Sequence, residues 1–193
     1  MTDGTLFVLT LLSALGCAMM AGVFFAFSTF VMKALARLPA EQGVAAMQAI
    51  NVAAVTFAFM AALFGTAAAC GTLAVWAFFA WSERIAPYLL VGSALYLVGT
   101  ILLTIAYHVP RNEALARAEP RGSGAERHWR RYLSGWTAWN HVRAAASLAA
   151  AAALTIALHV GRASNAGSLI TTQGGTLCHG RRSKPWAERL PTR

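Results

Sequence analysis

Long stretches without a charged residue constrain this chain more than any other feature. No Asp, Glu, Lys or Arg occurs in residues 4–32, 42–82, 85–109 or 144–161. A helix needs about 20 mostly apolar residues to cross a hydrocarbon core of about 30 Å. Because lipid offers no hydrogen bonds to the backbone, each crossing segment must satisfy its own, and the blocks lack the alternation of barrel strands. We therefore predict an all-α fold, a four-helix transmembrane bundle.

The expected domain boundaries follow from these blocks. One membrane domain, residues 1–160, should hold all the spans, and residues 161–193 should form a disordered tail because they show no sustained periodicity. The first block has no basic residue ahead of its apolar run, so we interpret it as a retained span rather than a secretory signal. The four spans are expected at about residues 6–32, 52–81, 88–109 and 137–160.

The charge of the chain indicates orientation rather than a nucleic-acid partner. The formal net charge is +9, but the basic residues lie beside the expected spans and in the tail. Basic residues concentrate in loops 33–51 and 110–136, and the positive-inside rule places both loops in the cytoplasm. We expect the lipid bilayer as the chief partner, no nucleic acid, and location in a bacterial inner membrane.

Metal and disulfide chemistry are not indicated by the cysteines. Cys17, Cys70 and Cys178 have neither the spacing of metal ligands nor that of a redox pair. Two of them lie inside apolar blocks, where cysteine behaves as a small buried residue. We expect no metal site.

Two polar patterns mark the interior of the bundle. Tyr96, Thr100, Thr104 and His108 recur every four residues, so they share one face of the third span that is unsuited to lipid tails. In residues 136–143, a polar and aromatic cluster meets the start of the last span. Its Trp136, Asn140 and Arg143, continued by Ser147, share a face. An arginine there must reach the interface or find partners inside the bundle.

The chain resembles the anthrone oxygenase-like family of small four-helix membrane proteins. The resemblance covers about residues 22–158 and is carried by four segments. These are Phe24-Phe25-Ala26-Phe27-Ser28-Thr29-Phe30, Ala46-Met47-Gln48-Ala49-Ile50-Asn51, His108-Val109-Pro110-Arg111-Asn112 and Trp136-Thr137-Ala138-Trp139-Asn140-His141-Val142-Arg143. Relatives often read Asn-Val-Pro-Leu-Asn where this chain has His108 and Arg111.

The resemblance implies an oxygenase that works without a cofactor on a lipophilic aromatic small molecule. The fungal enzymes of the family add oxygen to an anthrone without a metal or flavin, which requires only a base, a cation and an apolar slot. On this hypothesis His108 or His141 is the base and Arg143 stabilises phenolate charge. The substrate-binding residues would then be Gln48, Asn51, Thr104, Asn112, Trp136, Trp139 and Asn140.

Other interpretations of the same residues remain open. Arg143 could pair with lipid phosphate or loop carbonyls, and tryptophans at the end of a span are commonly interface anchors. The chain could be a non-enzymatic membrane protein that binds a small hydrophobic ligand or a partner subunit, including a homo-oligomer. A transporter is less favoured, because no acidic residue lies within the spans and no inverted repeat is evident.

Overall fold

The described part of the computed structural model consists of helices joined by short turns. The described residues are 3–119 and 124–178, with 164–178 given only as helical backbone, and they contain no strand. This confirms the predicted all-α fold. In chain order the α-helices are α1 (Asp3–Ala26), α2 (Met32–Leu35), α3 (Ala40–Ala53), α4 (Phe57–Phe79), α5 (Ala86–Tyr96), α6 (Val109–Ala116) and α7 (Ala125–Cys178).

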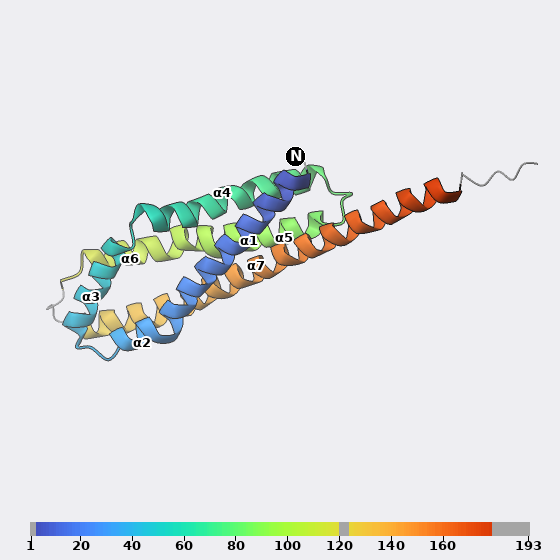
Figure 1. Ribbon diagram of the computed structural model, residues 1–193. Helices are drawn as coiled ribbons and strands as arrows, with labels where there is room; N and C mark the ends of the chain where they lie inside the picture. Colours follow the sequence, from blue (N-terminus) through green and yellow to red (C-terminus); the bar gives the residue numbers. More distant parts are fainter. Residues whose placement is uncertain (1–2, 120–123, 179–193) are drawn as a thin grey trace, which may run out of the picture.

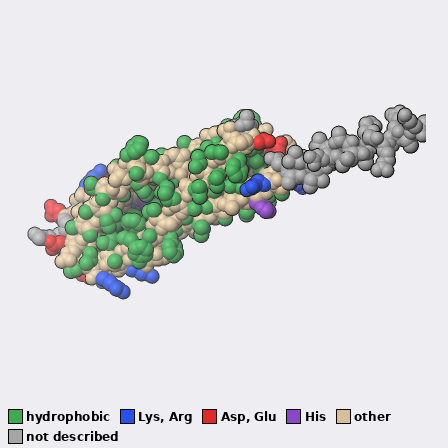
Figure 2. Space-filling view, in the orientation of Figure 1, with side chains coloured by type: hydrophobic (Ala, Val, Ile, Leu, Met, Phe, Trp, Pro, Cys, Tyr) green, Lys and Arg blue, Asp and Glu red, His purple; other side chains and the backbone are tan. Residues whose placement is uncertain are grey.

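Four helical stretches in this part of the chain are long and apolar enough to cross a membrane. They are Asp3–Leu35, Phe57–Phe79, Ala86–Ala116 and Ala125–Ala163. Large hydrophobic side chains such as Phe57, Phe79 and Val98 point outward, which a membrane span permits because its surroundings are also apolar. The space-filling view shows this apolar surface over the length of the bundle (Figure 2). The chain is therefore an integral membrane protein.

The long helices pack around a common core. α1 lies against α4 and α7, and α5 lies against the same two helices, so the four close a ring (Figure 1). Small residues allow the closest approaches: a Cβ atom on Gly99 would come within 2.4 Å of the Ala146 Cβ, and one on Gly16 within 2.1 Å of the Thr66 Oγ1. This is the packing expected in lipid, where helices associate through close contact.

One end of the bundle carries a second, smaller core. α2, α3, α6 and the first turns of α7 gather there (Figure 1). α3 begins after Pro39, and Glu41 in its first turn favours a helix start because an acidic side chain complements the helix dipole. The buried residues of this core are Met32, Leu35, Val44, Met47, Leu115, Trp129, Tyr132 and Trp136.

π-helical turns interrupt two of the spans. Phe27–Val31 continues α1 into α2, while Leu97–Leu102 and Thr104–His108 connect α5 to α6. π turns are rare and occur frequently at functional sites. Here they also explain why the third span passes Pro110. A proline has no N–H and clashes with the carbonyl four residues earlier, and a wider turn just before it relieves both problems.

The helix boundaries in the structure therefore differ from those expected from the sequence. The third helical stretch continues to Ala116 instead of ending near residue 109, and α7 begins at Ala125 instead of near residue 137. The large polar loop expected at 110–136 is thus mostly helix. α4 begins at Phe57, after a break at Ala54–Thr56. α7 is traced to Cys178, and residues 179–193 of the expected tail lie outside the described chain.

Candidate functional site

A buried arginine lies at the centre of the polar interior. Arg143, on α7, is only 6% exposed, so it neither reaches the lipid headgroups nor contacts a loop. Its Nη1 donates to the Thr104 hydroxyl at 3.1 Å, and its Nη2 donates to the Asn140 carboxamide oxygen at 2.5 Å. The guanidinium carbon lies 4.3 Å from the centre of the Phe24 ring and 5.4 Å from that of Trp136. The arginine is therefore held inside the bundle by neutral groups.

Asn140 connects α7 to α1. Its Nδ2 donates to the Phe24 carbonyl and to the Ser28 hydroxyl, both at 2.7 Å, and its oxygen accepts from Arg143. Asn140 is fully buried, and Ser28 lies in the π turn of the first span. All of its side-chain polar atoms are thus engaged, so Asn140 fixes Arg143 relative to α1.

His108 is buried beside this network without entering it. The side chain is 1% exposed, and neither ring nitrogen has a hydrogen-bond partner. Its ring centre lies 5.1 Å from that of Trp136. Buried polar groups are normally paired, so an imidazole without protein partners makes His108 a candidate functional group. Arg143 Nε is another buried atom without a partner, and Arg143 also contacts the Trp136 ring.

Asn112 and Tyr132 close the site toward the smaller core. The Asn112 oxygen accepts from the Tyr132 hydroxyl at 2.8 Å and from Trp136 Nε1 at 3.0 Å. The bond to Asn112 therefore fixes the Trp136 ring through its nitrogen. Asn51, at the end of α3 and near the Tyr132 hydroxyl, keeps a buried amide nitrogen without a hydrogen-bond partner.

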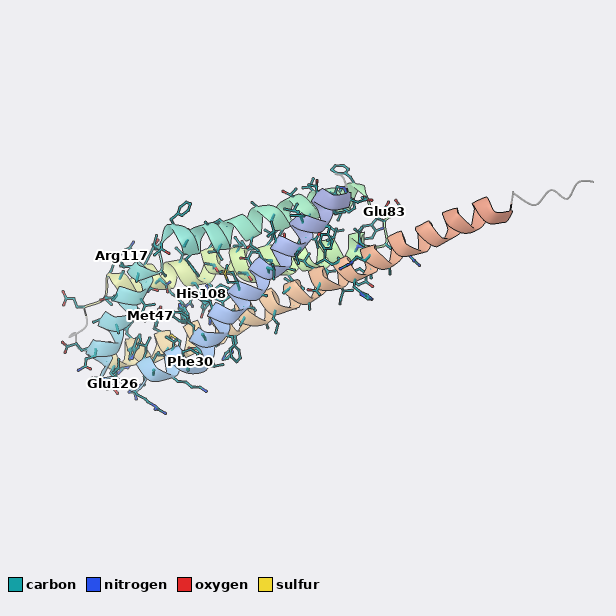
Figure 3. All side chains as sticks on the ribbon, viewed as in Figure 1. Phe30, Met47, Glu83, His108, Arg117 and Glu126 are labelled. Atoms are coloured by element: carbon teal, nitrogen blue, oxygen red, sulfur yellow. The ribbon has the colours of Figure 1, made fainter. Side chains whose placement is uncertain are left out.

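Irregular helical turns from two spans meet at the site. The space-filling view shows a hollow between α1 and α3, and His108 is labelled at the same place among the side chains (Figures 2 and 3). Both interrupted spans contribute π turns here: Ser28 belongs to one, and Thr104 and His108 belong to the last turn of the other. The irregular helices thus supply the side chains that surround Arg143.

A cavity lies at the end of the bundle that carries the smaller core. Its volume is about 740 Å³, and it lies between α6 and the first turns of α7. Tyr107, Trp129 and Tyr132 line it together with basic side chains that include Arg111 and Arg131. Tyr132 therefore belongs both to the lining of this cavity and, through its bond to Asn112, to the site.

Three of the sequence-predicted site residues lie apart from this arrangement. Gln48 Nε2 donates to the Leu115 and Ala118 carbonyls, at 2.8 and 3.3 Å, so it caps the end of α6. His141 is exposed on the outer face of α7. Trp139 is 43% exposed and packs against Tyr107, with ring centres 5.0 Å apart. The other predicted residues, His108, Asn51, Thr104, Asn112, Trp136, Asn140 and Arg143, surround the common site.

Sequence reasoning missed Tyr132, Ser28 and Phe24. Tyr132 was assigned to a loop, although the spacing of three and four residues that places Asn140 and Arg143 inward continues upstream through it to Trp129. Ser28 and Phe24 belong to a phenylalanine-rich segment that contributes to the family resemblance but is not among the predicted site residues. The signal that could have found Ser28 is its polarity within an otherwise apolar run.

No group of three or more His, Cys, Asp or Glu side chains that could hold a metal ion occurs within residues 3–119 and 124–163. Cys17 and Cys70 are buried free thiols on α1 and α4. The polar groups of the site are a guanidinium, an imidazole, amides and hydroxyls. These groups can bind and orient an oxygen-bearing aromatic molecule.

Comparison with known proteins gives one match. The family model described as anthrone oxygenase matches residues 53–153, which is just over half of the chain and includes His108, Asn112, Trp136, Asn140 and Arg143. No curated protein and no solved structure matches the chain. The matched segment contains α4, both interrupted parts of the third span and most of the membrane-crossing part of α7. The chain is therefore a member of the anthrone oxygenase family.

Proposed function

We propose that this protein is a cofactor-independent oxygenase that acts on a lipophilic aromatic substrate carrying a phenol and an activated methylene group. The proposal combines the family with a site that holds a cation, an imidazole and an aromatic wall inside the membrane. The observation that carries it is the pair of buried residues, His108 and Arg143, which both have unpartnered nitrogens and both contact the Trp136 ring.

The reaction has a simple balance. The substrate loses a proton and becomes a carbanion, which passes one electron to O₂, and the resulting radical pair joins to form a carbon-bound peroxide. Loss of water from this peroxide leaves a carbonyl, so one methylene and one O₂ give one ketone and one water. A base, a positive charge near the developing phenolate and exclusion of bulk water are what a protein must supply for this sequence.

Each of these needs has a candidate group in the site. His108 is the base, because a neutral imidazole has one acceptor nitrogen, and in this protein neither nitrogen is used elsewhere. Arg143 stabilises the phenolate through Nε, while Nη1 and Nη2 remain bonded to Thr104 and Asn140. Trp136 forms the aromatic wall together with Phe27 and Tyr132, and the bond from its Nε1 to Asn112 fixes its orientation.

Oxygen uptake by the purified protein tests the proposal. Full-length protein in detergent is mixed with anthrone-like phenols, and O₂ consumption is followed together with quinone absorbance. One O₂ should disappear for each quinone formed, at a rate well above that of the buffer control. Arg143→Gln should lower kcat/KM by about 30-fold to 100-fold, the loss of a charge-assisted hydrogen bond worth about 2–3 kcal/mol.

Arg131, which lines the cavity between α6 and α7, provides a matched control. Arg131 is exposed and lies on the same helix, so Arg131→Gln removes a positive charge without touching the proposed site. This variant should keep the rate within about twofold. Failure of folded wild-type protein to consume oxygen with any of the phenols would argue against the proposal, as would equal losses in the two variants.

Ligand binding without turnover is the alternative function. Unpartnered polar atoms on His108, Arg143 and Asn51 would suit a bound molecule whether or not it reacts. A compound that raises the apparent Tm of the solubilised protein and is recovered unchanged would favour this alternative.

A further inference from the structure

We infer that the site selects its ligand by charge: it binds lipophilic aromatic molecules as anions, with the anionic oxygen at Arg143, in preference to neutral molecules of the same shape. The inference uses the site of the proposed function but concerns binding alone. It therefore extends to organic anions that cannot be oxygenated.

Arg143 has no acidic side chain as its counter-ion within the described part of the chain. Arg143 is buried, and its hydrogen bonds go to the neutral oxygens of Thr104 and Asn140. Within the described part of the chain it has no ion pair with an Asp or Glu side chain. The acidic side chains lie outside the uncharged blocks, and Figure 3 places Glu83 and Glu126 at opposite ends of the molecule.

Tyr132 does not supply a negative charge to Arg143. Tyr132 is the residue near Arg143 that could ionise to an anion. Its hydroxyl donates to the Asn112 oxygen, which also accepts from Trp136 Nε1. An oxygen acceptor requires a proton on the tyrosine, so Tyr132 is neutral in this arrangement.

Lipid phosphates do not supply the negative charge either, because Arg143 is buried inside the bundle. Arg143 is 6% exposed, and both of its nearest rings, Phe24 and Trp136, are buried. The side chain therefore does not extend to the phosphates of the headgroups as a snorkelling arginine would. An uncompensated charge inside a membrane protein is costly, so a ligand that brings the opposite charge gains more from this site than a neutral ligand does.

Buried nitrogen atoms without a hydrogen-bond partner are available to contact the ligand. Arg143 Nε is a buried donor without a partner, and each His108 nitrogen is likewise free. The anionic oxygen fits Nε, because an anion adds coulombic attraction to the hydrogen bond that the guanidinium could make with any acceptor. His108 can then bond a second polar atom of the same molecule. Both residues lie beside the Trp136 ring, and the aromatic character of this wall favours a flat aromatic body.

Two naphthoquinones of nearly equal shape test the inference. The first, 2-hydroxy-1,4-naphthoquinone, is an anion at neutral pH, and the second, 2-methyl-1,4-naphthoquinone, is neutral. Both already carry their carbonyl oxygens, so binding is measured without turnover. We expect full-length wild-type protein in detergent to bind the anion at least about 10-fold more tightly, by quenching of tryptophan fluorescence and by calorimetry.

Variants assign the preference to one residue. Arg143→Gln and Arg143→Met should bring the ratio of the two affinities close to one, whereas Arg131→Gln should leave it unchanged. Arg143→Lys keeps the charge but not the planar fork, so it should keep a smaller preference for the anion. Apparent Tm and size-exclusion profiles establish that each variant is folded. If the Gln and Met variants do not fold, the wild-type ratio and the lysine variant decide.

The outcomes separate this inference from the oxygenase proposal. Equal binding of the two quinones by wild-type protein overturns it, and so does a preference that persists in folded Arg143→Gln or that is lost entirely in folded Arg143→Lys. Anion-selective binding without oxygenation of any phenol would leave the inference standing and remove the proposed activity. Oxygenation with no charge preference would do the reverse.

Discussion

The Asn140 carboxamide oxygen accepts a hydrogen bond from the guanidinium of Arg143, one turn further along α7. The amide nitrogen of the same Asn140 is bonded to α1, so one small side chain connects the cation to a different span. Arginine inside a membrane span is rare and generally functional. In this protein its position is fixed by neutral partners on α7 and the third span, and through Asn140 it is tied to α1.

Replacement of His108 by phenylalanine should separate function from stability. The imidazole is buried but makes no hydrogen bond, so His108→Phe breaks none and removes the cost of two unpaired polar atoms. The apparent Tm in detergent should stay the same or rise, while oxygenation falls by about 100-fold or more because the base is lost. Thermal unfolding and oxygen uptake measure the two effects.

Thr100→Val is the matched control for that experiment. Thr100 is also fully buried on the third span, but its hydroxyl shares a 2.7 Å hydrogen bond with Ser147. Valine leaves Ser147 unpaired, so the Tm should fall while activity is kept. A His108→Phe variant that is both less stable and fully active would show that the imidazole has a packing role only.

Asn140→Leu should destabilise the protein more than any single loss at its partners. The substitution keeps the approximate shape but leaves Ser28, the Phe24 carbonyl and Arg143 each without one bond. We expect a loss of about 2–4 kcal/mol, against about 0.5–1 kcal/mol for Ser28→Ala, since single hydrogen bonds in membrane proteins contribute little. Reversible unfolding in mixed micelles gives both values, and equal losses would contradict the bridging role.

Gln48 and His141 should prove dispensable for activity. Gln48 caps α6 through two carbonyls, so Gln48→Ala should cost about 1 kcal/mol of stability and leave kcat/KM within about twofold. His141 is exposed, so His141→Ala should change neither quantity. Steady-state kinetics with either variant that show a tenfold loss would restore it to the list of catalytic candidates.

Gly16 and Gly22 offer a test of packing within one helix. A Cβ atom at Gly16 would come within 2.1 Å of the Thr66 Oγ1, whereas one at Gly22 meets nothing within 4 Å. Gly16→Ala should therefore lower stability by about 1–3 kcal/mol because α1 and α4 must separate. Gly22→Ala should be neutral or slightly stabilising. Similar Tm values for the two variants would mean that α1 and α4 are not in close contact at Gly16.

The uncharged blocks were enough to predict four apolar helices, because transfer of long uncharged segments into lipid depends on composition and length alone. The inward face of α7 could also be predicted in part, since Trp136, Asn140 and Arg143 follow helical spacing. The same spacing continues through Tyr132, but the many charges around it led to its interpretation as a loop. Local composition outweighed periodicity there, and the structure shows a helix.

The sequence by itself determined that the chain crosses a membrane as helices and that Arg143 lies among polar and aromatic residues on one helix face. Only the tertiary structure decided which groups meet that arginine. It bonds Thr104 and, through Asn140, connects to Phe24 and Ser28 from the first span. Gln48 and His141, in contrast, lie elsewhere. The physical reason is that spacing along a helix fixes direction within that helix, whereas contacts between helices depend on how the spans pack and on the π turns that rotate their faces.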